Sequence, residues 1–164
     1  MEAMNLFKGK RVDNGEWVIG NLIFSEDALD GWEAIIIPTT NSNMYASDKD
    51  DTNKGDIHFE NWYRVDKDTV CRCTGMRDMN DELVWENDIV KFEDYGEEQG
   101  PEYKEGYEYE NNARVEFAEG RWSLTDFAED NSAVMDAMND HSEFMGLWNN
   151  SEVIGNIFDN PELL

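Results

Sequence analysis

Apolar residues recur with a period of two in most segments of the chain, a pattern that predicts β-strands. The runs 17–24 and 32–37 are rich in β-branched and aromatic residues, and turn or breaker residues border both. The segments 114–117 and 121–124 alternate apolar and polar residues on either side of a Glu-Gly pair, so they predict a hairpin.

These elements predict an all-β protein built as two small β lobes. Residues 1–68 form the N-terminal β lobe. Residues 69–164 form the C-terminal lobe, an SH3-like small barrel with an acidic insert at 93–112 and a short helix at about 132–145. The predicted barrel strands are Thr69–Thr74, Ile89–Phe92, Arg114–Phe117, Arg121–Leu124 and Val153–Phe158. A single α+β domain is the alternative architecture.

Three connections are predicted from turn and charge signals. Asp13-Asn14-Gly15 predicts a tight two-residue turn, because Asn-Gly tolerates positive φ angles. The polar stretch from Thr39 to Asp56 has no periodicity and predicts a mobile loop. Eight acids and one Lys lie between Glu93 and Glu110, and like charges at this density repel. The acidic insert is therefore predicted to be an exposed loop.

The net charge of −25 is distributed unevenly along the chain. Residues 1–92 hold 19 acids and 10 bases, whereas residues 93–164 hold 19 acids and 3 bases. Phosphate backbones are bound through Lys and Arg, so this balance argues against direct binding to nucleic acid. Acidity also serves solubility, which is the simplest interpretation of it. The asymmetry favours a protein partner with a basic surface.

Few residues are available for metal or nucleophilic chemistry. Cys71, Cys73, His58 and His141 lack the paired spacing of zinc ligands, and no phosphate-binding Gly-rich loop occurs. We therefore expect no metal, no cofactor and no enzymatic activity, with both cysteines acting as packing side chains. No apolar run has membrane-spanning length and no signal peptide is visible. These features predict a reduced, cytoplasmic protein without membrane contact.

Three blocks of sequence carry a resemblance to a known family. They comprise Phe7–Arg11 with Asp13–Val18 and Gly20, then Val65–Val70 with Thr74–Asp78 and Asp88–Val90, and finally Glu152–Leu163. In this order they are similar to the blocks of the YopX family of phage and prophage proteins. The resemblance implies a phage-associated protein whose role is non-enzymatic or uncharacterised, and it brings no catalytic residues to this chain.

The chain departs from the pattern of that family at four positions. The family usually has Gly at the positions of Cys71, Asp81 and Asn87, and an aromatic residue at the position of Cys73. Asp and Asn tolerate positive φ better than other non-glycine residues do. We therefore expect the backbone at Asp81 and Asn87 to keep the geometry that glycine would adopt.

The acidic insert also contains the candidate partner-binding residues Tyr95, Tyr103, Tyr107 and Tyr109. Tyrosine supplies contact area at low entropic cost, and an acidic rim steers a basic partner toward it. We expect a non-catalytic protein-binding or scaffolding module, and homo-oligomer formation is left open. The alternatives are an acidic DNA mimic that inhibits a host nucleic-acid-binding protein, an insert that is only a disordered spacer, and an enzyme with an unrecognised site.

Overall fold

A computed structural model describes residues 5–47, 55–99, 104–129 and 148–164. Strands dominate these residues, and within them no helix reaches seven residues, so the predicted all-β class is confirmed. The chain divides into two compact units, Met1–Cys73 (unit 1) and Thr74–Leu164 (unit 2). The sequence placed the boundary between the lobes five residues earlier, after residue 68.

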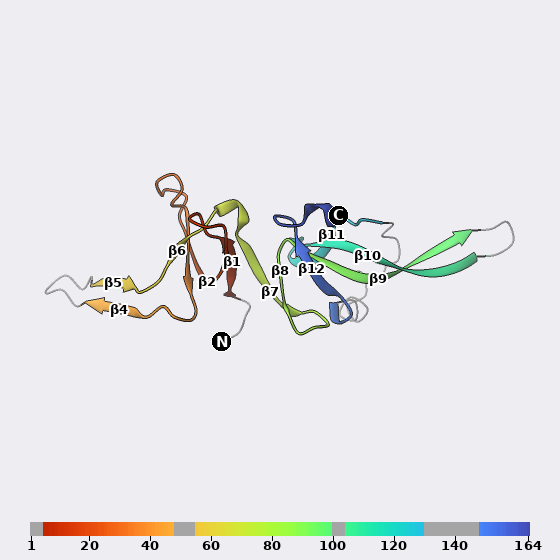
Figure 1. The fold of residues 1–164 in the computed structure, drawn as a ribbon, viewed down its shortest axis with the longest axis horizontal. Helices are drawn as coiled ribbons and strands as arrows, with labels where there is room; N and C mark the ends of the chain where they lie inside the picture. The colour runs from red at the N-terminus through yellow and green to blue at the C-terminus, as the bar shows by residue number, and fades with distance from the viewer. Residues whose placement is uncertain (1–4, 48–54, 100–103, 130–147) are drawn as a thin grey trace. The chain divides into compact units, whose positions relative to one another are not determined.

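Unit 1 is built on an antiparallel sheet with the strand order β6-β3-β2-β1-β7 (Figure 1). Its strands are β1 (Phe7–Lys10), β2 (Trp17–Phe24), β3 (Ala34–Pro38), β6 (Tyr63–Arg64) and the first residues of β7 (Cys71–Arg77). One face is covered by apolar side chains around buried Ala34, Ile36 and Val65. Burial of this face is the main stabilising contribution that the sequence of unit 1 supplies.

The connection between β1 and β2 is longer than the predicted two-residue turn. The backbone N–H of Arg11 donates to the carbonyl of Glu16 at 2.9 Å, and Gly15 adopts a φ of +74°. Four residues therefore separate this pair, and glycine supplies the left-handed position. The turn was located correctly, but its length was predicted wrongly because Asn-Gly alone does not fix which residues close the hairpin.

The stretch from Thr39 to Asp56 is not simply a loop. It contains β4 (Met44–Ser47), which pairs with β5 (Asp56–Phe59) in a two-stranded antiparallel sheet. Between β3 and β4 the hydroxyl of Ser42 donates to the carbonyl of Asn61 at 2.6 Å, which joins the two sides of this hairpin. The polar composition hid a short strand whose partner lies beyond it in sequence.

Unit 2 contains a four-stranded antiparallel sheet with the order β11-β10-β9-β12. Its strands are β9 (Asp88–Gln99), β10 (Lys104–Ala118), β11 (Arg121–Thr125) and β12 (Glu152–Asn156), and β8 (Leu83–Trp85) neighbours the end of β7. In the described parts of the chain this sheet is open at β11 and β12. The class of unit 2 is as predicted, but a closed SH3-like barrel is not seen. The helix predicted at about 132–145 lies outside the described residues.

The acidic insert is part of a long two-stranded ribbon rather than an exposed loop. Strands β9 and β10 pair continuously from Ile89 with Arg114 to Gln99 with Lys104. Their neighbours are much shorter, because β12 pairs only with Asp88 to Lys91 of β9 and β11 begins to pair with β10 at Arg114. Figure 1 shows the two strands running on together beyond these neighbours. We call the paired segments 93–99 and 104–110 the acidic ribbon.

The core of unit 2 lies under the sheet from which the ribbon extends. Its buried residues are Val84, Val90, Phe92, Ala113, Val115, Leu124 and Trp148. Phe92 also contacts Phe127 edge to face, with ring centroids 6.3 Å apart. Because Phe92 directly precedes the ribbon in β9, the core fixes the point at which the ribbon leaves the sheet.

Two polar arrangements join the last strand to the rest of unit 2. The buried carboxylate of Asp78 accepts hydrogen bonds from the backbone N–H groups of Asn80, Glu82 and Val153, at 2.9, 2.9 and 3.0 Å. After β12, the side chain of Asn160 fills the space beside Gly155, where a Cβ would lie 2.5 Å from the Asn160 Oδ1 atom. Residue 155, at the bulge in β12, therefore has no room for a side chain while Asn160 keeps this position.

Candidate functional site

Like charges face each other across the acidic ribbon. In the register of β9 and β10, Glu93 lies opposite Glu110, and Glu98 lies opposite Glu105. Cross-strand pairs of like charge are destabilising, so these positions do not improve the stability of the hairpin. Charged residues also protect free strand edges from pairing with other chains. Within the described residues, neither strand of the ribbon pairs with a third strand beyond the sheet, and the charge pattern opposes the ribbon's own pairing.

A buried polar cluster anchors the base of the ribbon. Asp94 is 5% exposed and Asn111 is 2% exposed. The Tyr109 hydroxyl donates to Asp94 Oδ2 at 3.1 Å, and the Asn111 amide donates to the same oxygen at 3.2 Å. The carboxylate is therefore compensated within the sheet, as a buried charge must be. This part of the predicted exposed insert is buried.

The four candidate tyrosines have different positions in the ribbon. Tyr109 is half-buried at its base, and its hydroxyl takes part in the anchoring cluster. Further along the ribbon, Tyr95 pairs with Glu108, and Tyr107 pairs with Gly96. Tyr103 lies outside the described residues. The register thus brings two of the four candidates onto the middle of the ribbon and gives Tyr109 a structural contact that the sequence did not indicate.

The acidic surface continues from the ribbon onto the sheet. Lys91 lies between Glu110, at 3.3 Å from its Nζ atom, and Glu152, at 3.8 Å. Glu93 lines the same hollow. Two carboxylates thus pair with one ammonium group beside a third acid, and all of these side chains are at least partly exposed. Exposed ion pairs of this kind contribute little to stability and exchange easily with a competing cation.

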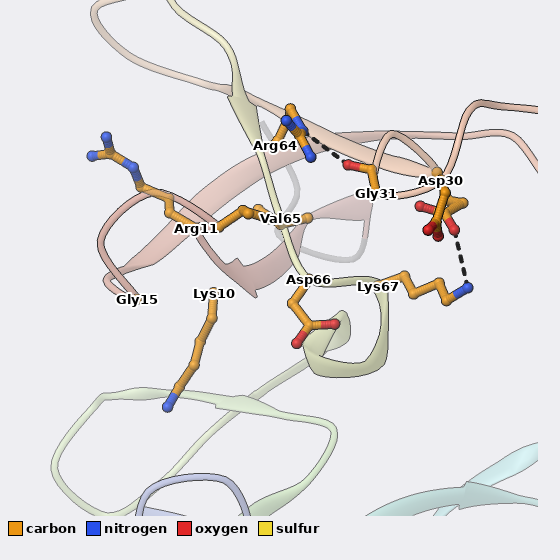
Figure 2. Close-up of a pocket in the computed structure, with 11 residues that line it drawn as sticks. Lys10, Arg11, Gly15, Asp30, Gly31, Arg64, Val65, Asp66 and Lys67 are labelled. Carbon is orange, nitrogen blue, oxygen red and sulfur yellow. Dashed lines mark hydrogen bonds and ion pairs between the residues drawn. The ribbon is translucent and has the colours of Figure 1, made fainter.

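Unit 1 carries a different surface, at a pocket of about 470 Å³ (Figure 2). Its cationic side chains are Lys10, Arg11, Arg64 and Lys67. Arg64 Nε donates to the carbonyl of Gly31 at 2.8 Å, and Lys67 Nζ lies 3.1 Å from Glu33. Figure 2 shows the side chains of Lys10, Arg11 and Lys67 leaving the pocket in different directions. The pocket therefore lacks the converging donors that hold a small anion.

Aromatic rings lie against both arginines of this pocket. The Arg11 guanidinium is 4.1 Å from the centroid of the Tyr63 ring, and the Arg64 guanidinium is 4.4 Å from a Trp32 ring. Trp32 also contacts Trp62, with centroids 6.0 Å apart. We call these five residues the Arg-aromatic patch. The sequence did not indicate it, because the pairing of β3 with β6 brings together residues about thirty positions apart.

Two cations of this pocket, Arg11 and Lys67, favour the ionised form of a neighbouring carboxylate. A hydrogen bond from Arg11 lowers the pKa of Asp13, with the Arg11 charge adding to the effect. Hydrogen bonds from its own backbone N–H and from Lys67 lower the pKa of Glu33. Both shifts show that the cations of unit 1 stabilise carboxylates placed beside them.

The residues considered for metal or nucleophilic chemistry are not assembled into a site. Cys71 and Cys73 are buried and unbridged, and the Cys71 thiol donates to the carbonyl of Thr69 at 3.3 Å. His58 is exposed on β5, and His141 lies outside the described residues. Among the residues that the structure describes, no group of three or more His, Cys, Asp or Glu side chains is placed to hold a metal ion. In the same residues, no helix has the length and apolar character needed to cross a membrane.

Comparison with known proteins gives a family and a fold but no named activity. The family model described as YopX protein matches residues 30–164. Among solved structures, the chain is similar to protein EF1440 from Enterococcus faecalis, with a TM-score of 0.51, 17% identity and 96% of each chain covered. At this identity the similarity concerns the fold alone. No curated protein matches the chain.

Proposed function

The chain belongs to the YopX family, and from this premise we propose that it is a non-catalytic protein-binding module whose acidic ribbon binds a basic protein surface. The observation that carries the proposal is the pairing of the acidic segments 93–99 and 104–110 into one antiparallel ribbon. A paired ribbon presents its side chains in fixed rows, whereas a loop would have to be ordered on binding.

Charge and tyrosine content support different parts of this activity. The carboxylates of the ribbon accelerate encounter with a basic partner and select against acidic ones. Affinity then comes from tyrosine side chains, which bury a large area and lose little conformational entropy. The acids around Lys91 extend the same surface onto the sheet. Binding of this kind weakens steeply as the salt concentration rises.

The setting that we propose is the cytoplasm of a phage-infected or lysogenic host. Family membership supports the phage association. Two buried, unbridged cysteines fit a reducing compartment, where thiols persist. A binding or scaffolding role requires no cofactor and no catalytic residue.

A second function, mimicry of DNA, is favoured by one feature of the ribbon. In the register of β9 and β10, Glu93, Glu97, Glu108 and Glu110 share one face of the ribbon, so several negative charges are concentrated there. A surface of concentrated negative charge resembles the phosphates that nucleic-acid-binding proteins recognise. A partner bound in this way would be displaced by duplex DNA, whereas a partner bound through tyrosine contacts would not.

The decisive experiment shortens the ribbon without disturbing its anchor. Residues 96–107 are replaced by Asn-Gly, which joins the paired residues Tyr95 and Glu108 and keeps Asp94 with its partners. The full chain and the shortened variant are then used to capture proteins from host lysate at low and high salt, with and without duplex DNA. We expect the shortened variant to fold and to lose the salt-sensitive partners.

A length-matched control separates charge from shape. Changing Glu97, Glu98, Glu105 and Glu108 to Gln keeps the ribbon and removes four charges. We expect this variant to bind the same partners more slowly and with weaker dependence on salt. If the shortened variant retrieves the same proteins as the full chain, the ribbon is not the binding surface and the proposal is wrong.

A further inference from the structure

We propose that the acidic ribbon of one copy binds the Arg-aromatic patch of a second copy, so that copies of this chain associate head to tail. The inference rests on the proposed function, because it assigns a partner to the same ribbon. It is carried by two surfaces of opposite character on one chain. The ribbon is acidic and contains tyrosines, whereas the patch contains arginines and exposed tryptophans.

The patch has the composition of a binding surface rather than of a structural core. Trp32 is 41% exposed and Trp62 is 44% exposed, although they contact each other and Trp32 also contacts Arg64. Trp, Tyr and Arg are the residues that dominate the energetics of protein interfaces. Arg11 and Tyr63 continue the patch around exposed Val12, which lines the pockets on both sides.

The arginines are held in place before any partner arrives. Arg64 lies against the backbone of Gly31, where a Cβ would come within 2.9 Å of its Nη2 atom, and it donates to the carbonyl of the same residue. The guanidinium also lies over the Trp32 ring, 4.4 Å from its centroid, which restricts its movement further. A stacked, oriented guanidinium retains donors at its edge that suit a carboxylate. Binding therefore loses little side-chain entropy at this residue.

An extended acidic segment fits this surface better than a small anion does. The cationic side chains diverge from the pocket, as Figure 2 shows, so one small ligand cannot contact them together. A ribbon with carboxylates along its length can meet divergent cations one after another. Arg11 donates two hydrogen bonds to Asp13, whose side chain is largely exposed, and an incoming carboxylate of the same geometry competes with Asp13 for this guanidinium.

The charge distribution sets the direction of association. Residues 1–73 hold 8 bases and 14 acids, whereas residues 74–164 hold 5 bases and 24 acids. The two surfaces belong to different units, so the contact is heterologous, and one such contact between two copies leaves one ribbon and one patch unused. Heterologous contacts build closed rings or open chains of copies. This arrangement suits the scaffolding role proposed above.

Long-range repulsion between copies limits the conditions for assembly. Each chain carries a net charge of −25, which opposes association at low salt. At physiological salt, charges farther apart than about 8 Å are largely screened, whereas pairs in direct contact keep part of their attraction. We therefore expect association to be strongest at intermediate salt and weaker on either side.

Mixing two defective variants tests the proposal directly. The first carries Arg11→Glu and Arg64→Glu and keeps the ribbon. The second is the shortened-ribbon variant, which keeps the patch. By sedimentation velocity with full-length protein, we expect the wild type to form assemblies and each variant alone to associate at least about 30-fold more weakly. An equimolar mixture of the two should form a species of two chains that grows no further, because only one complementary pair of surfaces remains.

Controls separate the specific contact from folding and net charge. Arg121→Glu with Arg77→Glu makes the same charge change outside the patch and should leave assembly intact. Arg64→Lys keeps the charge but loses the planar, stacked guanidinium, so it should weaken assembly to an intermediate degree. Circular dichroism checks that each variant is folded.

Three results would overturn the inference. They are a wild-type chain that stays monomeric at intermediate salt, a patch variant that assembles like the wild type, and a mixture in which the variants do not associate. If the wild type is monomeric while ribbon shortening still abolishes capture of host proteins, the ribbon remains a binding surface and only its assignment to a second copy fails.

Discussion

Each unit extends one hairpin beyond its main sheet, and the two hairpins differ in almost every property. In unit 1 the hairpin continues past β3 and β6 as the separate pair β4 and β5. Met44 and Ile57 there are 65% and 61% exposed, and with Ala46 and Phe59 they occupy one face of the pair. In unit 2 the hairpin is the continuous, acidic ribbon of β9 and β10.

The difference shows two ways in which a strand edge without a described partner strand can be composed. The residues of β4, Met-Tyr-Ala-Ser, include no charge and no proline, so its edge is not protected against pairing with another strand. The acidic ribbon protects its edges with carboxylates, but those carboxylates repel one another across the strands. In unit 1 the paired strands carry no like charges opposite each other, but they expose apolar side chains. In unit 2 the ribbon has charged edges, but like charges face each other across its strands.

The largest predicted effect tests whether the units are stabilised separately. Trp148 is buried in the core of unit 2, so Trp148→Ala should reduce the free energy of unfolding by about 3 to 5 kcal/mol. Hydrogen exchange should show lost protection in β9 and β10 and unchanged protection in β2 and β3. Trp62→Ala, at an exposed site, is the matched control and should cost less than about 1 kcal/mol. Equal loss of protection in both units would contradict this separation.

A smaller effect is expected at the polar anchor of the last strand. Asp78→Ala removes an acceptor shared by three backbone N–H groups, of which that of Val153 belongs to β12. Leaving such donors unsatisfied should cost about 2 to 3 kcal/mol. Chemical denaturation measures the loss, and Glu82→Ala in the same turn serves as a control for the loss of an exposed carboxylate. An Asp78→Ala variant as stable as its control would mean that water replaces the carboxylate.

The charge pattern of the ribbon leads to a stabilising substitution. Glu105→Lys places a cation opposite Glu98, where two like charges now face each other. We expect the ribbon to gain up to about 1 kcal/mol, seen as slower amide exchange in 93–99 and 104–110. Tyr45→Lys in β4 faces His58 and should give no such gain. A ribbon that gains no stability from Glu105→Lys would show that the cross-strand repulsion is already screened.

The smallest predicted effect concerns acid and is confined to unit 1. The pKa values of Asp13 and Glu33 are lowered in the folded state, so their contribution to stability is complete above the usual carboxylate pKa of about 4 and is lost as pH falls through the lower folded values. Amide chemical shifts of the β1–β2 turn should therefore stay constant from pH 7 to about 5 and change below about 4. In Asp13→Asn the turn should lose most of this dependence. A transition near pH 6 would contradict the assignment.

Several local features could be predicted because short-range physics determines them. The hairpin of β10 and β11 forms with Phe117 opposite Trp122, and Glu119 and Gly120 adopt the positive φ angles of the predicted turn. Asp81 and Asn87 adopt φ angles of +66° and +67°. The expectation that these two residues keep the backbone geometry of glycine is therefore confirmed. Asp and Asn are among the few non-glycine residues that tolerate this conformation.

The acidic ribbon was wrongly predicted to be a loop, because the repulsion between its carboxylates was considered without the backbone hydrogen bonds that strand pairing supplies. A cross-strand pair of like charges costs roughly 0.2 to 1 kcal/mol, whereas each residue added to a ladder gains hydrogen bonds of roughly 0.5 to 1.5 kcal/mol. The ladder that starts in the core at Val90 with Ala113 can therefore continue through the acids. The buried cluster of Asp94, Tyr109 and Asn111 adds a local anchor that charge density could not reveal.

The Arg-aromatic patch could not be predicted because it depends on strand order. Arg64 reaches Trp32 only after β6 has paired with β3, which no local pattern specifies. Trp62 and Tyr63 look like core residues of a strand when they are considered in sequence alone. Only the pairing shows which side chains remain exposed.

The fit between Gly155 and Asn160 has a consequence for how this protein can evolve. The Asn160 amide occupies the place of a Cβ at position 155, so a side chain gained there would collide with it. Replacing Asn160 with a smaller residue first removes the obstacle, and a change at 155 then becomes tolerable. The two positions are thus epistatic, and only one order of substitutions avoids a destabilised intermediate.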